Sequence, residues 1–137
     1  MKSIILNILD ASIETKRACI ESNLELIIQV TETLTGCLKR GNKILIFGNG
    51  GSAADAQHLA AEFVNRFQIE RPPLAAAALT TDASVLTSIG NDYHFNEIFS
   101  KQVMALGRRG DVAWDSSTSG NSATVVEAVG VARQIGM

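Results

Sequence analysis

The sequence is poor in the residues that mark several specialised classes of protein. Its 137 residues include two cysteines and two prolines, too few for a disulfide framework or a proline-rich disordered chain. Every apolar run is much shorter than the roughly 20 residues that span a bilayer. Twelve basic and fourteen acidic residues give a net charge of −2, with no block of one sign. Neither a nucleic-acid partner nor a membrane-binding basic patch is therefore expected.

The composition that remains is that of a globular domain. Hydrophobic residues make up 46% of the chain, and a chain of this length can bury a substantial core as one domain, residues 1–137. Asn7 and Asp10 interrupt the apolar N-terminal stretch, so it makes a poor signal peptide. Cys19 and Cys37 are isolated and lack metal-site spacing. These features predict a location in the reducing cytoplasm.

The apolar pattern predicts helices followed by alternating strands and helices. Residues 1–40 have helical periodicity, which predicts helices over 3–18 and 20–39. The first is apolar on more than one side, which indicates contact with another subunit. Short apolar runs ending in turn residues then predict buried strands. The expected strands are 43–47, 74–79 and 111–116, and the expected helices are 52–67, 83–89, 96–106 and 122–135. This alternation over 43–137 predicts an α/β fold with a doubly wound parallel sheet.

Two strand-to-helix turns have the composition of anion-binding sites. Residues 48–55 read Gly-Asn-Gly-Gly-Ser-Ala-Ala-Asp, in which glycines allow backbone amides to approach a ligand and Ser52 can cap the next helix. Residues 116–122 read Ser-Ser-Thr-Ser-Gly-Asn-Ser and offer hydroxyls at another helix start. Either turn alone is most simply a capped turn. Because ligands bind at the carboxyl ends of parallel strands, the pair predicts a phosphate site.

The first turn also matches the dinucleotide-binding pattern at Gly48, Gly50 and Ala53. That pattern requires an acidic residue about 20 positions further on, at the end of the second strand. Here the second strand ends near Thr80-Thr81-Asp82, after an intervening Pro72-Pro73. Nucleotide binding is therefore a minor alternative.

Further polar residues could act on the same ligand. His58 and Glu62 lie four positions apart on the predicted helix and so share a face. Such a pair is often a solvated helix face, but it can bind a metal or transfer a proton. Asn91 and Asp92 follow Gly90 in a predicted loop, where they form either a simple turn or a contact to a hydroxylated ligand.

Taken together, these motifs and their order resemble the phosphoheptose isomerase group of the sugar isomerase (SIS) superfamily. The resemblance runs from the N-terminal helices to Met137. It implies a three-layer, flavodoxin-like sandwich, a homotetramer formed through residues 1–40, and a phosphosugar-binding core over 43–137. It also implies cytoplasmic conversion of sedoheptulose 7-phosphate to D-glycero-D-manno-heptose 7-phosphate, which leads to lipopolysaccharide.

The resemblance further implies roles for individual residues. Glu62 would move a proton between C1 and C2 of the sugar through an enediol, and His58 with Glu62 would form half of a zinc site. Asn49, Asn91 and Asp92 would contact the sugar. The phosphate would be held by the Gly50-Gly51 turn together with Ser52, Ser117, Thr118, Ser119 and Ser122.

The sequence departs from the family pattern at two places. Family members continue through further strands and a last helix that completes the acid–base pair, so we expect the core to be incomplete at its C-terminal end and this chain alone to be a poor isomerase. Trp114-Asp115 precedes the second turn, where the family is usually apolar with a glycine, and an Asp115 facing the turn would weaken phosphate binding. The alternative function is a non-catalytic regulatory module, such as the protein of the same fold that binds the replication initiator DnaA.

Overall fold

The computed structural model describes all 137 residues, which divide into two compact units, Met1–Thr35 and Gly36–Met137. The first unit is almost entirely helical, and the second contains a parallel sheet with helices around it. No helix in either unit combines the length and the apolar character that crossing a bilayer requires.

Helix α1 (Lys2–Lys39) is interrupted at Asn23, where φ is −122° and ψ is 16°. The Asn23 side-chain amide donates a hydrogen bond of 2.8 Å to the carbonyl of Cys19, which is the acceptor that the Asn23 backbone amide would use in a regular helix. Asparagine side chains compete with helical hydrogen bonds in this way. The predicted boundary between helices 3–18 and 20–39 is therefore wrong by about one turn.

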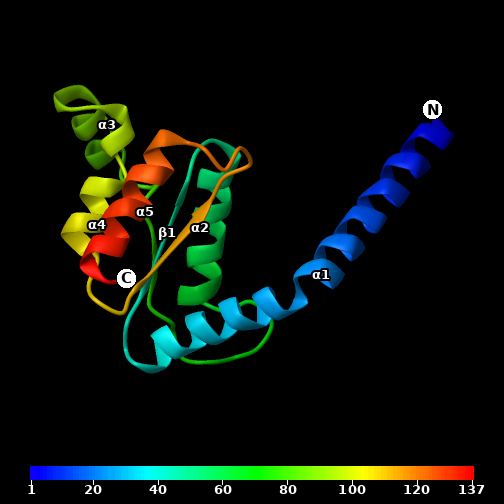
Figure 1. The fold of residues 1–137 in the computed structure, drawn as a ribbon, viewed down its shortest axis with the longest axis horizontal. Helices are drawn as coiled ribbons and strands as arrows, with labels where there is room; N and C mark the ends of the chain where they lie inside the picture. The colour runs from blue at the N-terminus through cyan, green and yellow to red at the C-terminus, as the bar shows by residue number, and fades with distance from the viewer. The chain divides into compact units, whose positions relative to one another are not determined.

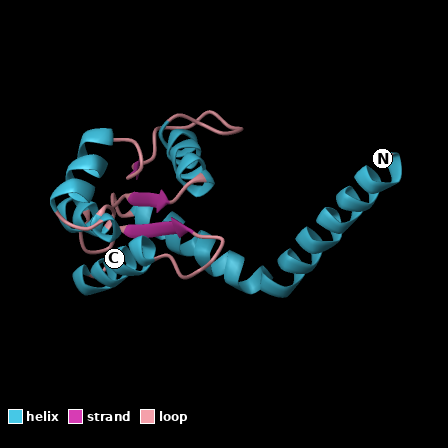
Figure 2. Ribbon diagram, turned by 90° about the horizontal axis from the view of Figure 1, so that it is seen from above, coloured by secondary structure: helices cyan, strands magenta, loops and turns pink.

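Three parallel strands form the sheet in the order β2-β1-β3. The central strand is β1 (Ile44–Gly48), which is buried along its whole length, as its continuous apolar sequence predicts. It pairs on one side with the short β2 (Ala76–Ala78) and on the other with β3 (Val112–Ser116). Figure 2 shows strand arrows pointing in the same direction with helices on either side of them. The predicted doubly wound parallel sheet is confirmed.

Helices cover both faces of the sheet. Helix α2 (Gly51–Val64) follows β1 and lies on one side of it, whereas α4 (Ser100–Leu106) and α5 (Ala123–Ile135) lie on the other (Figure 1). Helix α3 (Ala83–Asp92) and a 3₁₀ turn at Phe95–Glu97 connect β2 to α4. Helix α3 extends one turn beyond the predicted 83–89.

The core is built on the two faces of β1. Leu45 and Phe47 point to one face, where Phe47 packs on Phe99 with ring centroids 5.3 Å apart. The main cluster on this face comprises Leu45, Phe47, Leu79, Ile89, Ile98, Phe99, Val103, Val125, Ala128 and Ala132. Ile44 and Ile46 alternate onto the opposite face and are also buried. The apolar burial on both faces explains why β1 has no polar residue before its carboxyl end.

A partly buried ion pair between Lys43 and Asp111 joins the chain just before β1 to the chain just before β3. Asp111 is 3% exposed, and its carboxylate accepts hydrogen bonds from the Lys43 amide (3.0 Å), the Lys43 ammonium and the Arg108 amide (2.8 Å). Burial alone would raise the pKa of Asp111, but the hydrogen bonds from Lys43 and Arg108 outweigh it and lower the pKa below its usual value. The contact fixes the amino ends of the two strands relative to each other.

Candidate functional site

The carboxyl ends of β1 and β3 form the topological switch point of the sheet. The two strands are neighbours, but the chain leaves β1 for α2 on one face and leaves β3 for α5 on the other (Figure 1). The loops that follow these strands therefore diverge and leave a crevice between them, which is where open α/β sheets bind ligands. Both predicted anion-binding turns lie here.

The glycine at the end of β1 is required by the close approach of these two loops. A Cβ added to Gly48 would lie 2.7 Å from the Ser116 carbonyl oxygen and 2.7 Å from the Ser52 Cβ, which are distances that real side chains do not reach. Gly50 has a φ of +57°, in the region that favours glycine. The sequence Gly48-Asn49-Gly50 therefore brings the start of α2 directly against the end of β3.

A cavity of about 150 Å³ lies between the two loops. Its lining residues are Asn49, Ser52, Ser116, Ser117, Thr118, Ser119 and Ser122. The lining contains one amide side chain, six hydroxyls and no charged group. Six of the predicted phosphate- or sugar-binding residues are brought together here, and Ser116 is added to them. Gly50 and Gly51 shape the loop without lining the cavity.

The serine hydroxyls of the second loop accept hydrogen bonds from their own loop. The amide of Gly120 donates to Ser117 Oγ at 3.1 Å, and the amide of Asn121 donates to Ser119 Oγ at 3.3 Å. The chain then enters α5 after Ser122, so the positive end of the helix dipole faces the cavity. The arrangement is suited to an anion that is recognised by neutral donors.

Asn49 links the first loop to the start of α5. Its Nδ2 donates to Ser122 Oγ at 3.0 Å and to Thr124 Oγ1 at 2.8 Å, and these two hydroxyls are themselves 3.0 Å apart. Thr124 is 4% exposed and was not predicted as a site residue. The signal in the sequence is a second hydroxyl two positions after Ser122, which falls in the first turn of α5.

Asp115 does not line this cavity. The register pairs Asp115 with Phe47 and Trp114 with Ile46, so the pleat sends the Asp115 side chain to the sheet face of Phe47 and the Trp114 side chain to the opposite face. From the sequence, Asp115 is expected to weaken phosphate binding only if its carboxylate faces the loop. The alternation along β3 directs it elsewhere.

Glu62 lies in a second, larger cavity of about 310 Å³ on the α2 side of β3. The lining residues are His58, Leu59, Glu62, Phe63, Phe67, Arg71 and Trp114. Phe63 and Trp114 meet edge to face, with ring centroids 6.3 Å apart. The cavity is therefore largely apolar, with a carboxylate, an imidazole and a guanidinium at its walls.

The Glu62 carboxylate is only partly satisfied. Its Oε2 atom is buried without a hydrogen-bond partner, and its Oε1 lies 3.8 Å from His58 Nε2. The His58 side chain is 73% exposed, against 28% for Glu62. A carboxylate oxygen that is shielded from water and free of partners is placed to accept a proton from a bound molecule.

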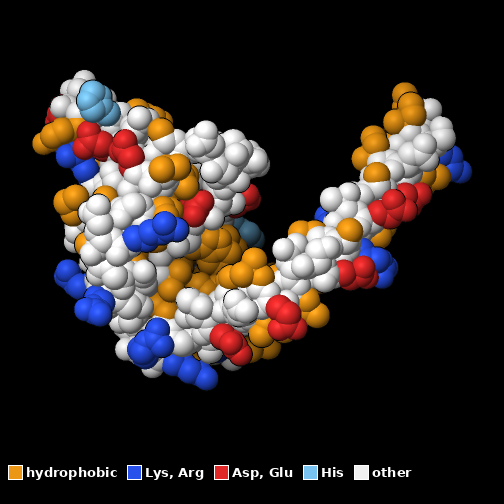
Figure 3. Space-filling model, in the orientation of Figure 1, with side chains coloured by type: hydrophobic (Ala, Val, Ile, Leu, Met, Phe, Trp, Pro, Cys, Tyr) orange, Lys and Arg blue, Asp and Glu red, His pale blue; other side chains and the backbone are white.

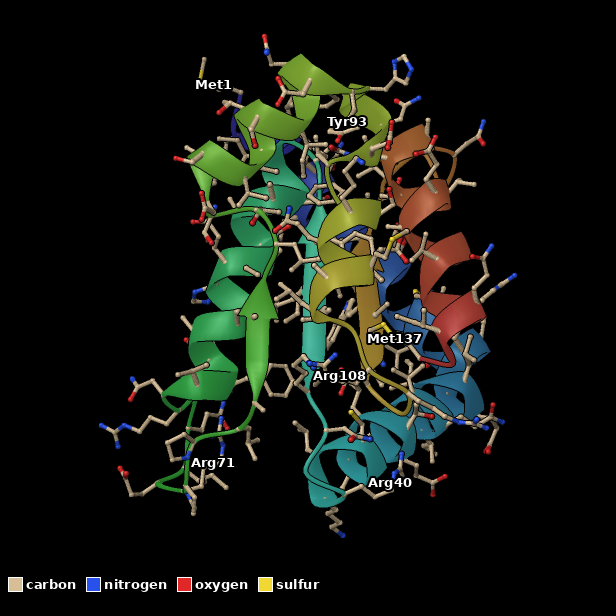
Figure 4. The ribbon with its side chains drawn as sticks, turned by 90° about the vertical axis from the view of Figure 1, so that its left-hand side faces the viewer. Met1, Arg40, Arg71, Tyr93, Arg108 and Met137 are labelled. Atoms are coloured by element: carbon tan, nitrogen blue, oxygen red, sulfur yellow. The ribbon has the colours of Figure 1, made fainter.

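Arg71 fixes the end of the helix that carries Glu62. Its guanidinium donates to the carbonyl oxygens of Glu62 (2.6 Å) and Phe63 (2.8 Å) and of Pro72 (3.0 Å). These contacts satisfy carbonyls that a helix end leaves without partners and add a positive charge where the dipole favours it. Figure 4 shows Arg71 beyond this end of α2, with Tyr93 at the opposite end of the sheet.

The structure separates the predicted residues into three places. Ser52 and Glu62 lie on the same helix, ten positions apart, or about 15 Å along its axis. Asn91 and Asp92 line neither cavity. They lie in the last turn of α3 rather than in a loop, and the Asn91 side chain donates to Asp92 Oδ1 at 2.8 Å. The prediction of a loop at these residues is wrong.

The residues present do not complete a zinc site. Zinc sites in proteins usually have at least three protein ligands, and no group of three His, Cys, Asp or Glu side chains is arranged to hold a metal ion. His58 and Glu62 supply two ligands at most.

The fold and the site define a doubly wound α/β protein with a hydroxyl-lined cavity at its switch point. Residues 9–137 match the SIS domain family, and the chain belongs to that family. Among its relatives are two phosphoheptose isomerases, each 58% identical, from Nitratidesulfovibrio vulgaris over 115 residues and from Azoarcus sp. over 123 residues. These matches cover 84% and 90% of this chain but 55% and 62% of the relatives, so the chain spans less than two thirds of their length.

Solved structures agree with these matches. The phosphoheptose isomerase of Neisseria gonorrhoeae superimposes with a TM-score of 0.90 at 49% identity, covering 99% of this chain and 71% of the other. The phosphoheptose isomerase of Francisella tularensis gives a TM-score of 0.75 at 37% identity, covering 90% of this chain and 71% of the other.

Proposed function

We propose that this chain is the phosphate-binding and proton-abstracting part of a phosphoheptose isomerase that interconverts sedoheptulose 7-phosphate and D-glycero-D-manno-heptose 7-phosphate. The observation that carries the proposal is the cavity of neutral donors between Gly48 and Ser122, found in a chain whose relatives have that name. A phosphate group fits this chemistry because the cavity offers hydroxyls, backbone amides and a helix N-terminus.

The separation of the two cavities suits an open-chain sugar of this length. The phosphate of a heptose 7-phosphate is at C7, whereas the reacting carbons C1 and C2 are at the other end of the molecule. The phosphate site and the catalytic base are therefore expected to be separated, and Ser52 and Glu62 lie about 15 Å apart along α2. One extended ligand would contact both.

In the proposed reaction the Glu62 carboxylate removes a proton from C1 of the ketose. The electron pair of the broken C–H bond forms the C1–C2 double bond, and the C2 carbonyl oxygen gains a proton to give an enediol. Return of the proton to C2, with loss of the O1 proton, gives the aldehyde. The buried and unpartnered Oε2 of Glu62 is the atom assigned to the C–H proton, because it has no competing hydrogen bond.

Three further features belong to the proposal. Binding of zinc by His58 and Glu62 stays a prediction, since this chain supplies only these two ligands. A cytoplasmic location also stays a prediction.

We also propose that residues 1–35 form the contact of a homotetramer, because their apolar side chains are exposed (Figure 3). The large exposed apolar residues of this unit are Met1, Ile4, Ile5, Leu6, Ile8, Leu9, Ile13, Ile20, Leu24, Leu26, Ile27, Ile28 and Val30.

The test follows proton abstraction directly. Incubation of sedoheptulose 7-phosphate with the protein in D₂O should introduce deuterium at C1, which NMR detects even when the overall isomerisation is slow. Glu62→Gln should lower this exchange by about 10²–10⁴ because the amide cannot accept the proton. Affinity for the substrate should change little. The matched control is Glu70→Gln, an exposed glutamate paired with Arg66 on the surface, which should exchange like the parent protein.

Two outcomes would contradict the proposal. Full exchange in Glu62→Gln would show that Glu62 is not the base. Tight binding of the sugar phosphate without any exchange in the parent protein would favour the regulatory module, in which the fold binds a ligand without chemistry.

A further inference from the structure

The serines of the second loop are arranged as donors toward the cavity. A hydroxyl has one proton and two lone pairs, and the backbone amides of Gly120 and Asn121 already donate to Ser117 Oγ and Ser119 Oγ. The two oxygens are 3.4 Å apart, which is long for a hydrogen bond between hydroxyls. Each hydroxyl proton is therefore left for a ligand.

At Ser122, the number of hydrogen bonds that the hydroxyl oxygen accepts depends on Thr124. The buried Thr124 hydroxyl accepts from Asn49 Nδ2 at 2.8 Å and must also place its own proton within the chain, because buried polar groups are paired. The nearest hydroxyl oxygen is Ser122 Oγ, at 3.0 Å. Ser122 Oγ then receives one proton from Thr124 and one from Asn49, at 3.0 Å. Its own proton is left to point into the cavity.

The opposite orientation of the Asn49 amide would have the reverse effect. Its carbonyl oxygen would accept the protons of both Ser122 and Thr124, and Ser122 would then present lone pairs to the cavity. Lone pairs repel an anion, so that arrangement conflicts with phosphate binding. The conflict is avoided when the Asn49 side chain presents its nitrogen to the two hydroxyls, because Nδ2 then donates to both of them.

We propose that Thr124 is a positioning residue that, together with Asn49, fixes the Ser122 hydroxyl as a donor, so that the cavity presents donors only and selects the fully ionised form of a phosphate monoester. The inference deepens the proposed function and rests on its phosphate site. A monoester loses its second proton near pH 6. Below that pH it carries an O–H that would meet another donor in this cavity, which leaves both without an acceptor.

The pH dependence is assigned to the ligand because the cavity lining has no titratable side chain. The acidic residues on the surrounding elements are Asp55 and Glu62 on α2, Asp82 before α3, Asp115 on β3 and Glu127 on α5. The nearest imidazole along α2 is that of His58, which lines the other cavity. Titration of these groups would change the affinity for any dianion equally. Sulfate, which carries no proton in this range, measures that contribution separately.

The experiment measures the affinity of the full chain for glycerol phosphate and for inorganic sulfate by calorimetry at pH 5 and pH 8. Neither probe has a carbonyl carbon, so the result is independent of isomerisation. Glycerol phosphate should bind about tenfold more weakly at pH 5, where roughly one tenth of it is dianionic. Sulfate affinity should change by less than about threefold. Sugar phosphate exchange at C1, measured separately, tests the proposed function and can fail or succeed on its own.

Two substitutions test the role of Thr124. Thr124→Val keeps the shape and removes the hydroxyl, and it should weaken sulfate binding about tenfold, the usual effect of losing a hydrogen bond to a charged group. It should also reduce the pH 5 to pH 8 difference for glycerol phosphate, because Ser122 can then accept the proton of the monoanion. Thr124→Ser retains the hydroxyl and should behave like the parent. Thr87→Val, which removes an exposed hydroxyl bonded only within α3, is the matched control.

The proposal is overturned if Thr124→Val changes neither the sulfate affinity nor the pH difference, or if Thr124→Ser is as weak as Thr124→Val. If Thr124→Val does not fold, the parent protein decides the question. Glycerol phosphate affinity that follows sulfate affinity at both pH values would show that the cavity does not distinguish the two protonation states.

Discussion

Glu62 is the one residue with a buried side-chain oxygen that lacks a hydrogen-bond partner. Burying a polar atom without a partner costs free energy, and no group donates to this oxygen in the cavity that Phe63 and Trp114 also line. Such a cost is characteristic of functional positions, where stability is given up for reactivity.

Replacement of this carboxylate by an apolar side chain should therefore stabilise the protein. Glu62→Leu should raise the free energy of unfolding by about 1–2 kcal/mol, as measured by denaturant unfolding followed through the fluorescence of Trp114, the single tryptophan. Deuterium exchange at C1 should be lost at the same time. Glu70→Leu, at an exposed position, should leave the stability within about 0.5 kcal/mol. A less stable Glu62→Leu variant would mean that the carboxylate is satisfied in solution.

Asp111 should make the stability depend on acid. Its pKa is lowered in the folded protein by hydrogen bonds from Lys43 and Arg108 that outweigh burial, so it contributes stability above its unfolded pKa of about 3.9. That contribution should be lost as the pH falls through the lower folded pKa. Asp111→Asn should lower the stability at pH 7 by about 1.5–3 kcal/mol and flatten its decline below about pH 4.

The control for this substitution is Asp115→Asn, which changes a partly buried carboxyl within β3, four residues after Asp111. Its denaturation midpoint should follow that of the parent protein from pH 7 to pH 3. An Asp111→Asn variant with the parent's acid response would assign the acid sensitivity to other carboxyls.

At the scale of elements, the glycine at the end of β1 should be the least replaceable residue of the sheet. Gly48→Ala places a methyl group 2.7 Å from the Ser116 oxygen and from the Ser52 Cβ, which should separate the loops, destabilise the fold by about 1–3 kcal/mol and abolish sulfate binding. Gly130→Ala in α5, where the added methyl group meets nothing within 4 Å, should be neutral or stabilising by up to about 1 kcal/mol. Retained sulfate affinity in Gly48→Ala would contradict the assigned cavity.

The elements that the sequence predicts well are those whose pattern reflects burial. Strand β1 is buried on both faces, and its unbroken apolar run and terminal glycine follow directly from that position. The cavity was predictable to the level of Asn49, Ser52 and the serines after β3, because strand ends and turn chemistry identify them.

The features that were missed depend on contacts between distant residues. The role of Thr124 arises from Asn49, which precedes it by 75 positions, and no local pattern encodes that contact. Asn91 and Asp92 have turn propensity, yet the packing of Ile89 in the core carries α3 through them. The interruption of α1 falls at Asn23 because of a side-chain bond to Cys19, whereas the apolar period alone gave a boundary one turn earlier.

For the whole molecule, the apolar side chains of residues 1–35 should drive self-association. Light scattering at micromolar concentration should give the mass of a tetramer, and Ile13→Glu should shift the population toward smaller species, since a charge cannot be buried in the contact without a partner. Thr15→Glu, at an exposed polar position of the same unit, is the control and should retain the tetramer. A monomeric parent protein would rule out this contact.

The order β2-β1-β3 also bears on how the chain acquires its structure. Strand β1 pairs with β2 over a separation of 32 residues, as at Ile44 and Ala76, but with β3 over 68, as at Ile44 and Val112. During synthesis the first pairing is available well before the second, and closing the longer loop costs more entropy. The hydroxyl cavity, whose two walls come from β1 and β3, is therefore completed among the last steps of folding. A ligand bound there would slow unfolding of the finished protein and leave the rate of its formation nearly untouched.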